Sequence, residues 1–163
     1  MLKFIRIFSA VLLLACMIFI FCMSAQDSSE SSDTSGRVIT AVLKIVYPDF
    51  NGLADTEKEA LVESLQFIVR KCAHFTIYAV MGILAFFTVG TYSMKFGIKP
   101  VLSAVICLLY SISDEIHQRF IPGRSGEFRD VCLDFSGSIL AIIFMVLIVK
   151  FSKRKFFNNY FKG

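Results

Sequence analysis

Ionisable side chains recur at helical spacing in the second half of the sequence. Asp114, His117 and Gln118 follow i, i+3, i+4 spacing, which places them on one face of a helix. Glu115 stands beside that face and can pair with Arg119 four residues later. Carboxylates and imidazoles transfer protons in many enzymes. The candidate catalytic residues are therefore Asp114, Glu115, His74 and His117.

Two further polar stripes and a turn supply candidate binding residues. Lys71, His74 and Tyr78 share a helical face, and Asp130 lies four residues before Asp134. Between the stripes, residues 121–129 contain Pro and Gly, which predicts a turn. Arginine binds phosphate through paired hydrogen bonds, and lysine binds it as a point charge. The candidate binding residues here are Lys71, Tyr78, Gln118, Arg124, Arg129, Asp130 and Asp134.

The composition indicates that a membrane positions these residues. Of the 163 residues, 56% are hydrophobic and only 18% are charged, and the mean hydropathy is +0.68. A soluble domain of this size cannot bury so much apolar surface. The same composition argues against a disordered chain and a nucleic-acid-binding protein. We therefore expect the lipid bilayer as a partner and no nucleic acid.

Four segments are expected to cross the bilayer, at residues 7–23, 72–94, 100–118 and 131–149. The first has about 25 Å of uncharged helix, which favours an uncleaved helix over a signal peptide. The third has an uncharged stretch of only about 21 Å, against a hydrocarbon core of about 30 Å. Extending it to Gln118 puts Asp114, Glu115 and His117 at the membrane boundary, where unpaired charges are costly. The predicted fold is an all-α bundle of four transmembrane helices.

Residues 24–70 form the expected outer segment. Composition alone predicts a flexible linker over residues 24–35. Apolar residues at helical spacing then predict a short amphipathic helix with Ser35 as a possible cap, ending before Pro48. The run Thr56 to Glu59 fits a capping box and begins a second amphipathic helix, which continues into the membrane at Cys72. These helices are expected to lie on the membrane surface or over the mouth of the bundle.

The charge distribution predicts the orientation. All thirteen acidic residues lie between Asp27 and Asp134, and both ends of the chain are purely basic. With both termini inside, nine basic and no acidic residues face the cytoplasm, while eight basic and thirteen acidic residues lie outside. This pattern agrees with the positive-inside rule. We expect a multi-pass protein of the bacterial cytoplasmic membrane, with a basic cytoplasmic tail at residues 150–163.

No motif identifies a cofactor, and the metal question stays open. The five cysteines lack the spacing of a zinc site and are interpreted as small apolar residues; Cys72 and Cys132 share a membrane side that permits a disulfide. The His, Asp and Glu residues named above contain enough ligands for zinc or manganese, but no tight motif joins them. A purely structural alternative is that Lys71, Arg124 and Arg129 only neutralise the nearby carboxylates.

Three motifs in order resemble the VanZ-like family of bacterial membrane proteins. The first is the stretch DEIHQRFIPGRSGEFRDVCLDFSG at residues 114–137, and the second is RKCAHFTIY at residues 70–78. The third is an S-x-Q element, Ser24 and Gln26, with spaced serines at 31, 32 and 35. This resemblance adds Ser24 and Gln26 to the binding candidates. It covers nearly the whole chain and implies one VanZ-like domain, with Ala141 where members often have a second glycine.

The resemblance implies a function in the cell envelope. The named member of the family is associated with low-level resistance to the glycopeptide teicoplanin. We therefore expect a polar site at the outer membrane face. Its possible partners are an envelope lipid, a lipid-linked cell-wall precursor or a glycopeptide. The alternative is a membrane-embedded enzyme, with or without a metal ion, that acts on a phosphate-containing lipid or lipid-linked precursor.

Overall fold

The chain folds into helices, as the computed structural model shows for residues 2–124 and 126–152. In chain order these are α1 (Leu2–Ser24), α2 (Ser28–Val46), the short 3₁₀ helix η1 (Pro48–Gly52), α3 (Asp55–Gly90), α4 (Ile98–Gln118) and α5 (Phe128–Phe151). No strand occurs among these described residues. The predicted all-α class is therefore confirmed.

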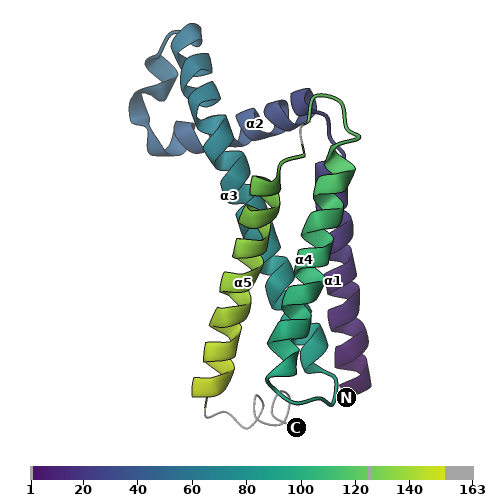
Figure 1. The fold of residues 1–163 in the computed structure, drawn as a ribbon. Coiled ribbons are helices and arrows are strands. Elements are labelled where there is room, and N and C mark those ends of the chain that lie inside the picture. Colours follow the sequence, from purple (N-terminus) through teal and green to yellow (C-terminus); the bar gives the residue numbers. More distant parts are fainter. Residues whose placement is uncertain (1, 125, 153–163) are drawn as a thin grey trace.

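Four of the helices form an elongated bundle, and α2 lies across one end of it (Figure 1). The bundle helices α1, α3, α4 and α5 are each long and apolar enough to cross a membrane, which makes the chain a multi-pass membrane protein. α1 and α4 finish near α2, and α5 begins there. We call this the polar end of the bundle. α3 continues beyond it and forms a protruding arm with η1 and α2.

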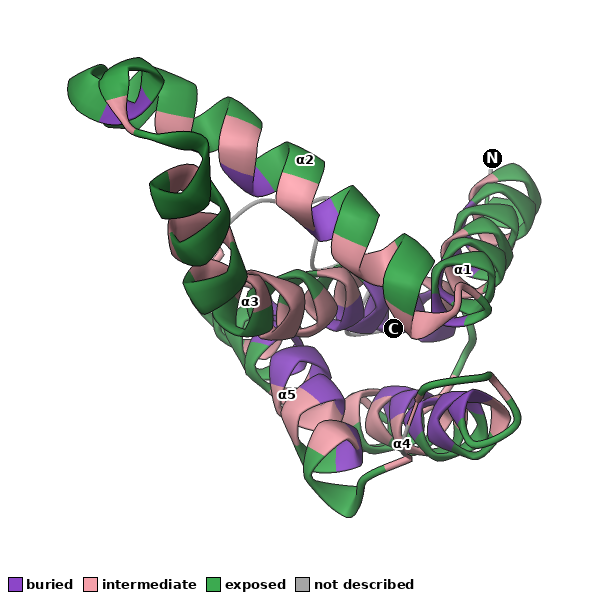
Figure 2. Ribbon diagram, turned by 90° about the horizontal axis from the view of Figure 1, so that it is seen from above, coloured by how far each residue is buried: buried purple, intermediate pink, exposed green. Residues whose placement is uncertain are grey.

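The exposed surface of the bundle is apolar because lipid is its expected solvent. On α1, Phe4, Ile7, Val11 and Leu14 are all more than half exposed. Figure 2 shows exposed residues over most of α1. Water would not stabilise such a surface, whereas lipid tails are as apolar as these side chains.

The buried core lies mainly between α3, α4 and α5. Tyr78, Met81 and Phe86 of α3 are fully buried, as is Cys107 of α4. Gly137 of α5 lies so close to the Phe75 carbonyl oxygen of α3 that a side chain at this position would clash. Small residues at such crossings let two backbones approach closely, which is how membrane helices gain packing energy.

The opposite end of the bundle is held together by basic residues. Arg6 donates a hydrogen bond of 2.8 Å to the Thr91 carbonyl and stacks 4.4 Å over the Tyr92 ring. Lys99 is buried and donates to the Gly90 carbonyl at 3.2 Å. α3 ends at Gly90, four residues before the end of the predicted span. The last carbonyl groups of a helix carry partial negative charge, so these cations stabilise the end of α3.

Three predictions about the segment between α1 and the bundle part of α3 were wrong. The expected linker is helical, because Asp27 caps α2 by accepting a hydrogen bond of 2.8 Å from the Glu30 amide. Ser35 lies inside this helix and donates to the Ser32 carbonyl instead of acting as the cap. α3 begins at Asp55 with Ala54 at the N-cap, where Glu57 accepts from the Ala54 amide, so the helix is capped two residues before the predicted box of Thr56 to Glu59. The predicted entry of this helix into the bundle without a break is confirmed.

Two further expectations concern the cysteines and the tail. All five cysteines are free, so Cys72 and Cys132 form no disulfide. Cys107 is fully buried, as expected of a small apolar residue. Of the predicted basic tail, residues 153–163 lie outside the described part of the chain.

Candidate functional site

Asp114 joins three elements at the polar end. Its carboxylate is 3% exposed, and one oxygen, Oδ2, accepts hydrogen bonds from Ser24 at 2.9 Å, Tyr78 at 3.0 Å and Gln118 at 3.1 Å. These partners come from the end of α1, the middle of α3 and the next turn of α4. The other oxygen, Oδ1, is buried without a hydrogen-bond partner among the described residues. Asp114 therefore connects helices and retains an acceptor for a further donor.

Gln118 extends this network to the turn after α4. Its Oε1 accepts a hydrogen bond of 3.2 Å from Arg124, whose second terminal nitrogen lies 3.4 Å from the Met23 carbonyl. Gly123 brings Arg124 back over the bundle with a φ of 73°, which favours glycine. A side chain there would also lie 2.6 Å from the Ser28 hydroxyl of α2. The turn therefore packs against both α1 and α2.

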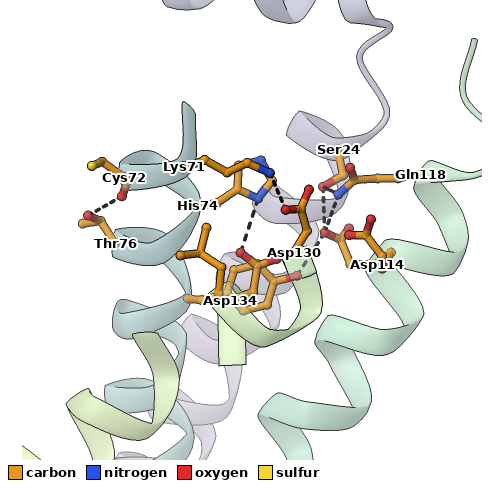
Figure 3. Close-up of polar contacts among 12 residues, drawn as sticks. Ser24, Lys71, Cys72, His74, Thr76, Asp114, Gln118, Asp130 and Asp134 are labelled. Atoms are coloured by element: carbon orange, nitrogen blue, oxygen red, sulfur yellow. Dashed lines mark hydrogen bonds and ion pairs between the residues drawn. The ribbon is translucent and has the colours of Figure 1, made fainter. Parts of the chain in front are cut away.

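A second group of polar residues joins α3 to α5. Lys71 forms an ion pair with Asp130, in which both side chains are partly exposed. His74 Nδ1 lies 3.6 Å from Asp134 Oδ1, too far for a direct hydrogen bond. Asp134 is 1% exposed, and neither carboxylate oxygen has a hydrogen-bond partner in the described structure. Figure 3 shows this group beside the contacts of Asp114, whereas Cys72 and Thr76 lie apart from both.

A polar cavity of about 290 Å³ opens between these groups. Most of its lining side chains carry charge or hydrogen-bonding groups, supplied by α2, α3, the end of α4, the turn after it and the start of α5. The polar lining residues are Ser28, Ser31, Arg70, Lys71, His74, Gln118, Arg124, Glu127, Asp130 and Asp134. The predicted convergence of separate helix ends is thus visible for five candidates: Lys71, His74, Gln118, Asp130 and Asp134, together with Arg124 from the turn.

Several predicted residues lie near this cavity without lining it. Tyr78 is fully buried beneath it and contacts Asp114, and Ser24 binds the same carboxylate. Gln26 lines a neighbouring apolar cavity. These residues support the site from below and from the side.

Three other candidates are directed elsewhere. Glu115 is buried and accepts a hydrogen bond of 2.6 Å from the Glu127 amide; among the described residues it forms no ion pair with Arg119, contrary to the predicted pairing. His117 stacks on Phe21, with ring centroids 4.3 Å apart. Arg129 is exposed and lines neither cavity. Glu115 and His117 therefore stabilise the turn and the α1 to α4 contact in this geometry.

Four polar lining residues were missing from the predicted site: Ser28, Ser31, Arg70 and Glu127. Arg70 lies four residues before His74, so helical spacing could have placed it on the same face. Helical spacing could not place the two serines, because the first turns of α2 were predicted as linker; Ser31 does stand among the spaced serines of the family motif. Their contribution depends on α2 lying across the polar end.

Burial and the positive charge of Arg70 both change the pKa of Arg124. Desolvation lowers the pKa of its guanidinium, and the positive charge of Arg70 lowers this pKa further. An arginine stays protonated at neutral pH even so. Two cations therefore lie close enough to repel each other beside the cavity.

Metal binding finds no support in these contacts. Among residues 2–124 and 126–152, no group of three or more His, Cys, Asp or Glu side chains is arranged to hold a metal ion. The described chemistry of the site is instead that of arginine, lysine and hydroxyl donors next to buried carboxylates. Such a site can bind an anion and can exchange protons with it.

Comparison with known proteins identifies one family. The model of the VanZ/LLP1 family matches residues 8–149, which is most of the chain. No curated protein and no solved structure matches this chain. The matched range contains every residue that lines the polar cavity.

Proposed function

This chain belongs to the VanZ/LLP1 family, and from that premise we propose that it binds an anionic component of the cell envelope through the polar cavity. The observation that carries the proposal is the pair of arginines, Arg70 and Arg124, beside a cavity with a buried carboxylate, Asp134. Arginine and hydroxyl donors bind phosphate oxygens, and the carboxylate accepts hydrogen bonds from hydroxyl or amine groups of the same ligand.

The polar end is proposed to face the outside of a bacterial cytoplasmic membrane. This orientation places the basic residues at the start of α1 and in the turn after α3 on the cytoplasmic side, as the positive-inside rule favours. Envelope lipids and lipid-linked precursors are then present at the depth of the cavity. In this setting, low-level teicoplanin resistance is a consequence of altered envelope components.

The cavity volume favours a headgroup over an intact glycopeptide. Pockets for drug-sized ligands measure about 300–1,000 Å³. The polar cavity, at about 290 Å³, lies just below this range. A phosphate-containing headgroup fits such a volume, whereas a glycopeptide antibiotic is much larger. We therefore place the glycopeptide as an indirect target and the lipid or lipid-linked precursor as the ligand.

A second candidate function is an enzyme acting on the same ligand. The observation that favours it is His74 beside buried Asp134, since a carboxylate that orients an imidazole is a common arrangement for general acid–base catalysis. Here His74 would move the proton and Asp134 would orient it. Replacing His74 with Gln separates the two functions: an enzyme loses turnover, whereas a binding protein retains its effect on the envelope.

The test compares envelope lipids, cell-wall precursors and teicoplanin susceptibility in cells that express wild type or variants. Arg124→Gln and Asp134→Asn, which change two lining residues of the polar cavity, are expected to abolish the effect of the protein. The matched controls are Arg37→Gln and Asp33→Asn, which change the same charges at exposed positions of α2. All four proteins must be present in the membrane at equal amounts. If the site variants act like wild type, the proposed function is wrong.

A further inference from the structure

We propose that the ligand is a single phosphate-headed amphiphile, whose headgroup lies between Arg70 and Arg124 and whose chain lies between α1, α2 and α3. The inference rests on the proposed function, because it names the ligand class of the same site. Its basis is a second cavity that adjoins the polar one.

The second cavity is apolar and measures about 260 Å³. Side chains of three helices form its walls. Its apolar lining residues are Phe19, Ile20 and Met23 of α1, Val38 of α2, and Val69, Ala73 and Ile77 of α3. Most ligand cavities combine such an apolar wall with a few polar groups that fix orientation.

The two cavities share four residues: Ser31, Arg70, His74 and Arg124. All four can donate hydrogen bonds, and none is acidic. The acidic lining residues Glu127, Asp130 and Asp134 belong to the polar cavity alone. The junction is therefore lined by hydrogen-bond donors, and the Asp134 carboxylate lies behind one of them, 3.6 Å from His74 Nδ1.

The carboxylates of Asp27, Asp114 and Glu115 act electrostatically on Arg124, but none of them lies within ion-pair distance of it. Arg124 donates to the neutral oxygens of Gln118 and Met23. Within the described residues, neither Arg70 nor Arg124 forms an ion pair with a carboxylate. Their mutual repulsion is part of what lowers the Arg124 pKa. A phosphate between them would relieve that repulsion and could accept the fork of hydrogen bonds that guanidinium groups present.

The apolar cavity continues to the lipid-facing surface of α3. A shallow apolar groove along this helix shares Val69, Ala73 and Ile77 with it. The groove extends to Cys72, Thr76 and Val80 on the outside of the bundle. An acyl or isoprenoid chain can therefore leave the junction and reach the bilayer without passing a charged residue.

Headgroup and chain contribute differently to binding. A chain that moves from bilayer to an apolar cavity gains little free energy, because lipid tails are as apolar as the cavity wall. The arginines supply the affinity, since a hydrogen bond between charged groups contributes about 1.5–3 kcal/mol, which corresponds to about 10-fold to 100-fold in binding. The position of the chain must therefore be tested by mapping where the bound lipid lies. The role of the headgroup must be tested by changing the charge of the protein or of the lipid.

The test uses the full chain in phosphatidylcholine nanodiscs that contain a small fraction of phosphatidic acid with a diazirine in its acyl chain. After illumination, mass spectrometry maps the adducts. We expect adducts on the apolar cavity residues of α1, α2 and α3 to exceed those on Leu140, an exposed residue of α5, by about tenfold. The same probe built on phosphatidylcholine should show no such excess, because choline cancels the charge.

Charge dependence is measured with Arg124→Gln and Arg70→Gln, with Arg37→Gln as the exposed control. In the two site variants, the ratio of cavity adducts to Leu140 adducts should fall about tenfold, to an even distribution. The control should keep the wild-type ratio. The comparison of the two lipids on the wild-type chain needs no variant, so a misfolded variant does not prevent a result. An even distribution of phosphatidic acid adducts around the bundle would overturn the inference.

Inorganic phosphate distinguishes failure of this inference from failure of the proposed function. It is titrated calorimetrically onto the wild type, Arg124→Gln and Arg37→Gln in phosphatidylcholine nanodiscs. If adducts are even but phosphate binds and Arg124→Gln weakens that binding, the anion site stands and the chain position is wrong. If adducts are even and phosphate does not bind, both proposals are wrong.

Discussion

Replacing Asp114 with alanine removes the acceptor that connects α1, α3 and α4. Ser24, Tyr78 and Gln118 all donate to the same carboxylate oxygen, and the first two reach it from other helices. Tyr78 and Ser24 are at most 1% exposed, so their hydroxyl groups cannot turn to water. We expect this substitution to destabilise the bundle more than any single loss of a donor.

The magnitude follows from the two interhelical bonds. Hydrogen bonds between membrane helices average about 0.6 kcal/mol and reach about 1.7 kcal/mol. Losing both should lower the free energy of unfolding by about 1–3 kcal/mol, with the upper part of the range favoured because two buried hydroxyl groups lose their acceptor. Ser24→Ala removes one bond and should cost about 0.6 kcal/mol.

The assay is reversible unfolding of the purified protein in mixed micelles, followed by helical circular dichroism as sodium dodecyl sulfate is added. Asp33→Ala is the matched control, because Asp33 is exposed on α2 and should change stability by less than about 0.5 kcal/mol. The reasoning is refuted if Asp114→Ala stays within about 0.5 kcal/mol of the wild type. It is also refuted if Ser24→Ala lowers the free energy of unfolding as much as Asp114→Ala does. Asp114→Ala should cost more, because it removes the bonds from both Ser24 and Tyr78.

Three further predictions concern packing, a surface pair and a helix cap. Gly137→Val should lower stability by about 1–3 kcal/mol or more in the same unfolding assay, because the side chain meets the Phe75 carbonyl. Lys71→Met should cost less than about 1 kcal/mol there, because its pair with Asp130 is partly exposed. Hydrogen bonds from Glu30 and Ser29 lower the Asp27 pKa, so its contribution to α2 is present above the unfolded value of about 3.9 and is lost as pH falls through the lower folded value. The measurement is hydrogen exchange of the first-turn amides of α2. Asp27→Ala should lose their protection at neutral pH, whereas Asp27→Asn should keep it and should not lose it as the pH falls. Equal protection in the wild type and both variants would contradict the cap.

The bundle could be predicted from the sequence because hydropathy and helix length are local properties. Four apolar segments required four spans, and the i, i+3, i+7 spacing placed Lys71, His74 and Tyr78 on one face. The same spacing placed Asp130 and Asp134 together at the start of α5. We expected these polar stripes to converge because they lie at the same end of their predicted membrane spans.

The start of α2 could not be predicted from the same signals. Serine and aspartate are weak helix formers inside a helix and strong ones at its cap, so a serine-rich tract reads as a linker. Packing of Ser35 and Ile39 against the rest of the arm overrides this propensity. The error moved Ser28 and Ser31 out of the predicted site.

The individual partners of the polar residues also depend on tertiary packing. Glu115 was expected to pair along its own helix with Arg119, but the turn after α4 brings the Glu127 amide within 2.6 Å of it. The approach of Ser24 to Asp114 depends on the position of α1 against α4. Spacing along one helix defines a face, whereas the neighbour of that face is determined by how the helices cross.

The most direct test of the account is native mass spectrometry of the protein extracted with its lipids from a bacterial membrane in mild detergent. The wild type and the Arg37→Gln control should each retain a phosphate-containing lipid or lipid-linked precursor. The Arg70→Gln, Arg124→Gln double variant, folded and monodisperse, should have lost it. Retention of the same molecules by the double variant, or of none by the wild type, would contradict an anion site at the junction of the two cavities.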